Sequence, residues 1–299
     1  MNSLPSTPCY LNGAFTPLCD AKISVMDRGF IFGDGIYEVV PVYHGRPFRF
    51  AQHMARLERS MVEMRMTNPH TREQWLGIAM GLIGHGARAE GVAPDALNQL
   101  VYIQVTRGVA MRDHVMPTDI VPTVFAMANV MRPPTPEQLE KGVACVTADD
   151  FRWEKAHIKS TSLLGSVFSR QISYDAGALE TVMFRRGFLS EAAASNVWAV
   201  KDGVVIGTPK DNLVLEGIRY GLIEELCKSL GRPYRLQRLS REEVLDADEL
   251  LLTSATKEVL AITLLDGEPV GKAAHRGHPG PVCQELYAAY QAAKLTDGE

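Results

Sequence analysis

A cluster of prolines near the middle of the chain is the sequence feature that most limits how this protein can fold. Segment 132–137 reads RPPTPE and holds three prolines. Proline has no backbone N–H and clashes with the preceding helical turn, so this segment is expected neither to join a sheet nor to continue a helix. We therefore expect an interdomain linker at 132–137, an N-terminal domain over 1–131 and a C-terminal domain over 138–299. The length of 299 residues allows two domains, each with its own core.

Turn signals and apolar periodicity predict that both domains are of the α+β class. Asn12-Gly13 between apolar residues is typical of a two-residue hairpin, and 40–48 is expected to form a second hairpin. The remaining expected strands are 99–107, 120–131, 143–147, 181–189, 197–209 (turning at 201–203) and 249–253. The expected helices are 51–64, 71–85, 160–174, 218–230 and 282–294.

Composition excludes several classes of protein. A net charge of −4 and a pI near 6.1 do not indicate binding to nucleic acid or to an anionic membrane surface. The N-terminus lacks the pattern of a signal peptide, and no apolar stretch is long enough to span a bilayer. The five cysteines are scattered without CxxC pairs, which argues against a disulfide framework and a zinc site. We expect a cytoplasmic protein.

Lys159 and Glu191 are the first candidate site residues. Lys159 follows Ile158 and precedes Leu163-Leu164-Gly165, so an apolar setting is expected for its amine. A desolvated lysine loses some preference for its charged form and becomes a usable nucleophile. Glu191 is expected in a turn between two strands. Most such lysines and glutamates are ordinary surface residues, but together they match a pyridoxal phosphate site, where the lysine forms a Schiff base and the acid holds the ring nitrogen protonated.

Three further segments are candidates for binding a phosphate. Arg56 lies on a predicted helix and offers a rigid donor fork, although it could be a plain surface arginine. Ile218 and Arg219 follow Gly217 at a predicted helix start, where free backbone N–H groups bind phosphate well. Ser254 and Ala255 follow a strand and supply N–H and hydroxyl donors. None of the three is diagnostic by itself.

Other motifs in the chain fit less well. Ser254 and Lys257 match the S-x-x-K pattern of serine acyl-enzymes, but the companion motifs S-D-N and K-T-G are missing. Gly33-Asp34-Gly35 begins like a dinucleotide fingerprint, yet Glu38 stands where the third glycine belongs. His275 and His278 near Cys283 are too few ligands at the right spacing for a metal. We expect no metal.

The chain resembles the class IV pyridoxal phosphate aminotransferases, the group that holds D-amino-acid and branched-chain aminotransferases. The likeness runs from Tyr10 to about Val270. The motifs that carry it are Asp27-Arg28-Gly29, Phe32-Gly33-Asp34-Gly35, His53-x-x-Arg56-Leu57, Lys159-Ser160-x-x-Leu163-Leu164-Gly165, Glu191, Ser195-Asn196-Val197 and Gly217-Ile218. The resemblance implies a small N-terminal domain and a larger C-terminal domain in a homodimer.

The same resemblance implies roles for single residues. Lys159 would be the Schiff-base lysine, Glu191 the partner of the pyridine nitrogen and Arg56 a phosphate ligand. The loop after residue 108 contains Arg112-Asp113-His114, and Arg-x-His at this point is similar to the D-amino-acid branch. In that branch the arginine and histidine reach across from the partner subunit and, with the residue matching Tyr37, hold the substrate α-carboxylate.

The sequence departs from the D-specific pattern in three places. Ala192-Ala193-Ala194 replaces a glycine and serines, Arg219 replaces a threonine, and Ala255 replaces another threonine. Each change removes a hydroxyl near the phosphate or the ring. We expect cofactor binding to survive because the backbone donors remain.

The resemblance implies ping-pong transamination between a D-amino acid and a 2-oxo acid. D-Alanine with 2-oxoglutarate, and D-glutamate with pyruvate, are the expected pairs. A branched-chain L-amino-acid aminotransferase and an aminodeoxychorismate lyase of the same fold stay open as alternatives. A serine acyl-enzyme using Ser254 and Lys257 and a non-catalytic binding protein are the alternatives from other classes.

Overall fold

The computed structural model describes residues 4–272 and 275–299, and the chain divides into two compact units. Unit 1 holds the chain up to Arg132, with Ile158–Leu163 and Lys294–Glu299. Unit 2 holds Pro133–His157 and Leu164–Ala293. Two short segments from the C-terminal half therefore pack with unit 1, a feature that the division at 132–137 does not anticipate. That division into two independent domains stays a prediction.

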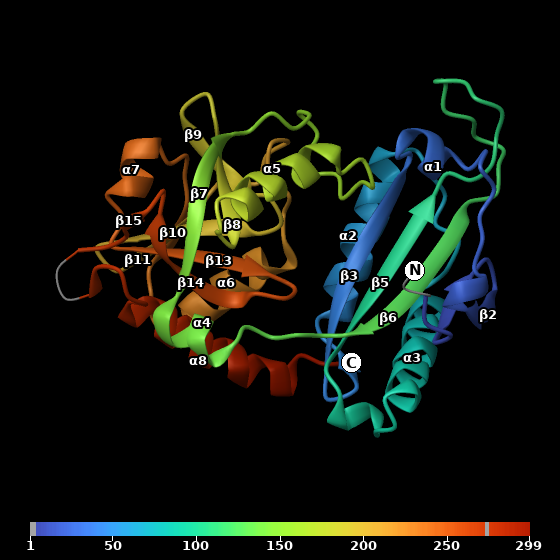
Figure 1. Ribbon diagram of the computed structural model, residues 1–299, viewed down its shortest axis with the longest axis horizontal. Helices are drawn as coiled ribbons and strands as arrows, with labels where there is room; N and C mark the ends of the chain where they lie inside the picture. Colours follow the sequence, from blue (N-terminus) through green and yellow to red (C-terminus); the bar gives the residue numbers. More distant parts are fainter. Residues whose placement is uncertain (1–3, 273–274) are drawn as a thin grey trace. The chain divides into compact units, whose positions relative to one another are not determined.

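Unit 1 is an antiparallel sheet in the order β2-β1-β6-β5-β3-β4 with two long helices (Figure 1). Its strands are β1 (Pro8–Leu11), β2 (Ala14–Pro17), β3 (Gly35–Tyr43), β4 (Arg46–Pro47), β5 (Gln99–Thr106) and β6 (Thr123–Val130). Its helices are α1 (Arg28–Phe32), α2 (Phe50–Glu63) and α3 (Arg72–Ala89), with short 3-10 turns at Leu18–Asp20 and Pro94–Ala96. The Asn12-Gly13 hairpin is confirmed, because both residues have the positive φ that a tight hairpin turn requires.

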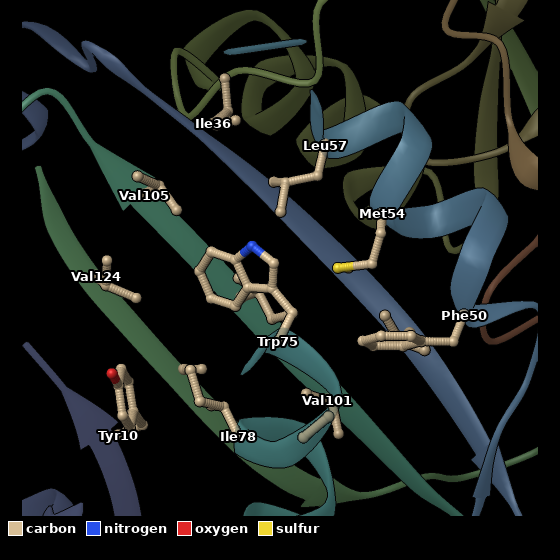
Figure 2. Packing of buried hydrophobic residues seen from close by; sticks show 14 of the residues in the cluster. Tyr10, Ile36, Phe50, Met54, Leu57, Trp75, Ile78, Val101, Val105 and Val124 are labelled. Atoms are coloured by element: carbon tan, nitrogen blue, oxygen red, sulfur yellow. The ribbon is translucent and has the colours of Figure 1, made fainter. Parts of the chain in front are cut away.

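The core of unit 1 forms between the sheet and helices α2 and α3. Figure 2 shows Phe50, Met54 and Leu57 of α2 directed at the sheet, with Trp75 of α3 over its centre. Alternation along β3 places Ile36, Glu38 and Val40 on this helix-covered side, and Tyr37 and Val39 on the other side. Glu38 is thus a carboxylate directed into the core.

Unit 2 is a larger mixed sheet in the order β12-β11-β10-β13-β14-β7-β8-β9, with β15 paired to β14. Its strands are β7 (Val143–Asp149), β8 (Glu180–Arg185), β9 (Phe188–Ala192), β10 (Asn196–Lys201), β11 (Val204–Gly207), β12 (Tyr234–Leu236), β13 (Glu249–Ser254), β14 (Glu258–Leu265) and β15 (Glu268–Pro269). Its helices are α4 (Pro136–Lys141), α5 (Leu164–Asp175), α6 (Ile218–Ser229), α7 (Arg241–Leu245) and α8 (Pro281–Thr296), the last of which ends in unit 1.

Three element predictions are wrong in detail. Pro136 begins helix α4, where its missing N–H costs nothing at the first helical position, and Thr135 caps that helix. The strand expected over 181–189 is two strands, because Arg186 and Gly187 both adopt positive φ and form a turn. The helix expected from Ser160 begins only at Leu164, because residues 160 and 161 pair with β3 instead.

The α+β class is confirmed by these two units. Within the described parts of the chain, no helix is both long and apolar enough to cross a membrane.

Candidate active site

Lys159 belongs to a short segment that is held by backbone hydrogen bonds against the start of β3. The Tyr37 N–H donates to the Lys159 carbonyl at 3.0 Å, and the Thr161 N–H donates to the Gly35 carbonyl at 2.9 Å. Gly33 permits this close approach, because a Cβ there would stand 2.7 Å from the Ser162 hydroxyl. The Gly-rich turn therefore provides the space in which the lysine segment lies.

The Lys159 ammonium lies over the ring of Tyr37, with Nζ 4.0 Å from the ring centroid. Tyr37 lies on the side of the sheet away from α2 and α3, and its ring is 5.7 Å from that of Tyr102. Ile158 is buried, as expected, but Leu163 and Leu164 are exposed at 36% and 69%. The apolar setting expected for Lys159 stays a prediction, and the aromatic ring of Tyr37 contacts the amine.

Arg56 is buried on α2 and pairs with Glu38. Its Nε and one terminal nitrogen donate to the two Glu38 oxygens at 2.7 and 2.8 Å, and His53 Nδ1 lies 2.7 Å from Glu38. Burial alone would raise the pKa of Glu38, but the charge and hydrogen bonds of Arg56 hold it well below its usual range. The pair fixes the plane of the guanidinium, while the phosphate role of Arg56 stays a prediction.

Glu191 lies in unit 2, within strand β9 rather than in the expected turn, which comes two residues later. One oxygen accepts from Arg152, and the other accepts from the Asn196 amide at 3.1 Å and the Leu215 N–H at 3.3 Å. A carboxylate has room for about four hydrogen bonds, so one position remains for a further donor such as a ring N–H. The donor set therefore fits a protonated pyridine nitrogen.

Burial dominates the acidity of Glu191. It raises the pKa of this carboxyl to about 6, although the positive charge of Arg152 acts in the opposite direction. Arg152 also binds Asp150 with two nitrogens at 2.9 Å, and this pairing lowers the pKa of Asp150 to about 2 against the effect of burial. Arg152 is shared between two carboxylates, so Glu191 receives only part of its charge. A cationic partner would stabilise the ionised form.

Ile218 and Arg219 form the first turn of α6, as expected, with Gly217 as the N-cap. The first N–H groups of a helix have no acceptor within the helix and suit an anion. A Cβ at Gly217 would stand 2.1 Å from the Asn196 side chain, so any other residue here would displace the Asn196 amide. The buried Arg219 guanidinium donates to the Tyr290 hydroxyl at 2.8 Å, which ties α6 to α8.

Ser254 and Ala255 lie where β13 turns into β14. The Ser254 hydroxyl accepts from the backbone N–H of Lys257 at 3.0 Å, so it shapes the turn. The Lys257 ammonium donates to the buried Glu180 at 3.0 Å, and Glu180 also accepts from Ser195 and the Ala194 N–H. A serine acyl-enzyme needs Lys257 as the base for Ser254, and the structure directs that lysine to Glu180 instead.

Arg112 and His114 lie in the exposed connection between β5 and β6. The Arg112 guanidinium carbon is 5.4 Å from the centroid of the Phe32 ring, and the His114 ring is 5.3 Å from the same centroid. Within unit 1, Arg112 and His114 thus meet at Phe32, and Lys159 meets Tyr37. The other predicted site residues of this set belong to unit 2: Glu191, Ile218, Arg219, Ser254 and Ala255.

Several charged partners were missed by sequence reasoning. No role was predicted for Arg152, Asp150 or Glu180. Arg152 reaches Glu191 39 positions away and Glu180 accepts from Lys257 77 positions away, while Asp150 pairs with Arg152 only two positions along the chain. Glu38 and His53 stand inside recognised motifs, and the spacing of His53 and Arg56 on one helix face was an available clue. In residues 4–272 and 275–299 no group of histidine, cysteine or acidic side chains is arranged to hold a metal ion.

Comparisons with known proteins identify the family of this chain. Residues 35–265 match the family model described as amino-transferase class IV. The D-alanine aminotransferase of Staphylococcus epidermidis is 34% identical over 286 residues, which cover 95% of this chain and 97% of that protein. The D-alanine aminotransferase of Bacillus licheniformis is 33% identical and covers 96% of each chain.

Solved structures show the same fold. The branched-chain amino acid aminotransferase of Escherichia coli matches with a TM-score of 0.83 and 25% identity, covering 96% of this chain and 94% of that one. The T.th. branched-chain enzyme with pyridoxamine 5'-phosphate matches with a TM-score of 0.86 and 24% identity, covering 97% and 95%. The family match extends over most of the chain, and the protein belongs to the class IV aminotransferases.

Proposed function

We propose that this protein is a pyridoxal phosphate-dependent D-amino-acid aminotransferase that transfers the amino group of D-alanine or D-glutamate to a 2-oxo acid, 2-oxoglutarate or pyruvate. The observation that carries the proposal is the 34% identity to a D-alanine aminotransferase along nearly the whole of both chains. The departure at Ala192-Ala193-Ala194 is compatible with it. The Ala194 N–H and the Ser195 hydroxyl both donate to Glu180. The turn at 193–195 is therefore held without the hydroxyls that the alanines lack.

The residues present fit pyridoxal phosphate. Lys159 would hold it covalently through its amine, and Glu191 would accept from its ring N–H. Arg56, the first backbone N–H groups of α6 (Ile218 and Arg219) and the Ser254-Ala255 turn would bind its phosphate. When bound, the cofactor supplies a carbonyl that receives the amino group and a ring that takes up the electrons of the broken Cα–H bond.

The chain's own side chains would then act on the substrate. Arg112, His114 and the Tyr37 hydroxyl would bind the α-carboxylate, since a guanidinium, an imidazole and a phenol all donate to such an oxyanion. Lys159, once its amine is released, would act as base and then as acid. It would remove the proton from the substrate Cα and deliver it to C4′ of the cofactor. Glu191 would keep the ring nitrogen protonated throughout.

A branched-chain L-amino-acid aminotransferase is the second candidate. The observation that favours it is the likeness to two solved branched-chain enzymes. The exposed Arg112 and His114 favour the D-amino-acid activity instead. Assays of purified protein with D-alanine, D-glutamate or L-leucine as donor decide between the two, and turnover of L-leucine alone would overturn the proposal.

We also propose a homodimer in which the exposed face of α5 is covered by a second copy. This helix buries polar side chains and exposes apolar ones: Ser169 and Ser173 are buried, while its large apolar side chains are exposed. The exposed ones are Leu164 at 69%, Val167 at 59%, Phe168 at 58% and Ile172 at 38%. Their spacing forms one stripe along the helix, and a contiguous apolar stripe of this kind marks an interface. Symmetric pairing of two copies is the commonest way to bury it.

A reducing cytoplasm is the proposed setting. Four of the five cysteines are buried as free thiols, which is compatible with an environment where disulfides are rare.

A further inference from the structure

Phe32 is contacted by three cationic or imidazole side chains that come from two separate parts of unit 1. Arg28 stands one turn earlier on the same helix, with its guanidinium carbon 4.8 Å from the ring centroid. Arg112 and His114 approach the same ring from the connection between β5 and β6, at 5.4 and 5.3 Å. The two residues proposed to bind the substrate carboxylate therefore share one aromatic contact.

The position of Phe32 is fixed by buried charges around α1. Asp27 caps the helix by accepting from the Gly29 N–H at 2.8 Å, and Gly33 ends it in the left-handed region. Asp34 pairs with Arg28 at 2.7 Å and with Arg107 at 2.8 Å, all three being buried. Burial alone would raise the pKa of Asp34, but the hydrogen bonds from Arg107 and Arg28 keep it below its usual value. Asp34 therefore stays ionised and holds Arg28 in place.

Arg28 connects this buried cluster to the loop. Its Nη1 donates to the carbonyl of Asp113, the residue between Arg112 and His114, at 2.5 Å. The Arg28 N–H also donates to the Gly108 carbonyl at 2.9 Å, near the start of the loop. The loop is therefore held through its backbone by Arg28 and through two side chains by Phe32.

An aromatic contact is well suited to a cation that must bind an anion. The face of a ring attracts a guanidinium without using its N–H donors or cancelling its charge, whereas a carboxylate would do both. Within residues 4–272 and 275–299, the side chains of Arg112 and His114 form no ion pair with an acid. The contacts with Phe32 orient both groups and leave their donors available.

We infer that Phe32 is a positioning residue that presents Arg112 and His114 to the α-carboxylate of the substrate, with Arg28 as the anchor of the same loop. The inference rests on the proposed function, since it requires a substrate that carries a carboxylate. Phe32 acts on substrate binding through Arg112 and His114, and not on the proton transfer at Lys159. Its loss should therefore raise KM and leave kcat unchanged.

The test compares Phe32→Leu, Phe32→Tyr and Phe30→Leu in the full-length protein loaded with pyridoxal phosphate. Phe30 is the matched control, because it lies on the same helix and is 68% exposed. Two measurements are made on each variant: kcat and KM for D-alanine with 2-oxoglutarate, and the proton chemical shifts of the His114 ring, assigned with His114→Asn. The chemical shifts report the ring contact whether or not the enzyme turns over.

Phe32→Leu should move the His114 shifts and raise KM for D-alanine about fivefold to tenfold, the size expected for losing one cation–π and one ring contact. Phe32→Tyr, which keeps the ring, and Phe30→Leu should match the parent in both measurements. Moved His114 shifts with an unchanged KM would overturn the inference and leave the proposed function standing. A parent protein that does not turn over any D-amino acid would instead overturn the proposed function, and this inference with it.

Discussion

Lys159 has two separate tasks in the proposed reaction, to hold the cofactor and to move a proton. Lys159→Ala should therefore abolish the visible absorbance of the lysine-bound cofactor and also slow amino-group transfer roughly a thousandfold, the size of a lost general base. The absorbance spectrum and the rate with D-alanine check both effects. Lys155→Ala is the control, because Lys155 is exposed and only four positions away. Equal losses of absorbance and rate in the two variants would show that Lys159 does not have the proposed roles.

Glu191 makes the stability of the cofactor-free protein depend on pH. Its pKa is about 6 in the folded protein against an ordinary value of 4.5, so the folded state binds the proton more tightly than the unfolded state. This contribution is fully present below about pH 4.5 and is lost as the pH rises through about 6, with a size of about 2 kcal/mol. Glu191→Gln should remove it.

Urea unfolding of the parent and of Glu191→Gln at pH 4.5 and pH 7 measures the effect. We expect the parent to lose about 2 kcal/mol more than the variant between the two pH values. The same pH dependence in both proteins would show that Arg152 already keeps Glu191 ionised at the lower pH.

The residues that carry chemistry differ in how far sequence could find them. Lys159 and Glu191 stand in recognisable local patterns, and their roles stay predictions. The ion pairs of the candidate site are harder to find, because Arg152 is 39 positions from Glu191 and Glu38 is 18 positions from Arg56. Such pairs are created by the register of strands and helices, which a single sequence does not show.

At the scale of elements, the turn between α1 and β3 should be intolerant of any side chain. Gly33 has φ of 65° and would place a Cβ 2.7 Å from the Ser162 hydroxyl and 3.1 Å from the Ser162 Cα. Gly33→Ala should therefore lower the free energy of unfolding by about 2 kcal/mol, through backbone strain and the displaced lysine segment.

Gly91→Ala should carry the backbone strain alone, so its comparison with Gly33→Ala isolates the cost of displacing the lysine segment. Gly91 has a similar φ of 70° after α3, but a Cβ there would meet nothing within 4 Å. Chemical unfolding of both variants gives the comparison, and we expect Gly33→Ala to be the more destabilised. Equal losses would mean that the contact with Ser162 contributes nothing.

Most elements were predictable from local signals, and each failure has a physical cause. Helices α2, α3, α6 and α8 follow apolar periodicity to within a few residues of the predicted bounds. The start of α5 could not be predicted, because Lys159 and Thr161 form backbone hydrogen bonds with β3 more than 120 positions earlier. Strand β14 (Glu258–Leu265) was missed, since a strand buried at all but one position lacks the polar alternation that identifies an exposed one.

At the scale of the whole molecule, the exposed stripe on α5 predicts a dimer that a single charge would disrupt. Phe168→Glu should convert the dimer to a monomer, because a charge buried between two apolar faces has no partner. Val62→Glu is the control, since Val62 is 67% exposed as a single apolar residue on α2. Sedimentation or light scattering gives the mass of each variant. A monomeric parent, or a dimer that Phe168→Glu leaves intact, would contradict the proposed interface.

The proposed D-amino-acid activity is best tested by the visible absorbance of the protein loaded with pyridoxal phosphate, followed during separate additions of D-alanine and L-leucine. A D-amino-acid aminotransferase should lose the band of the lysine-bound cofactor on adding D-alanine and keep it with L-leucine. Adding 2-oxoglutarate should then restore the band, because the amino group leaves with the second substrate. Loss of the band with L-leucine alone would contradict the D-amino-acid activity and assign the chain to the branched-chain enzymes.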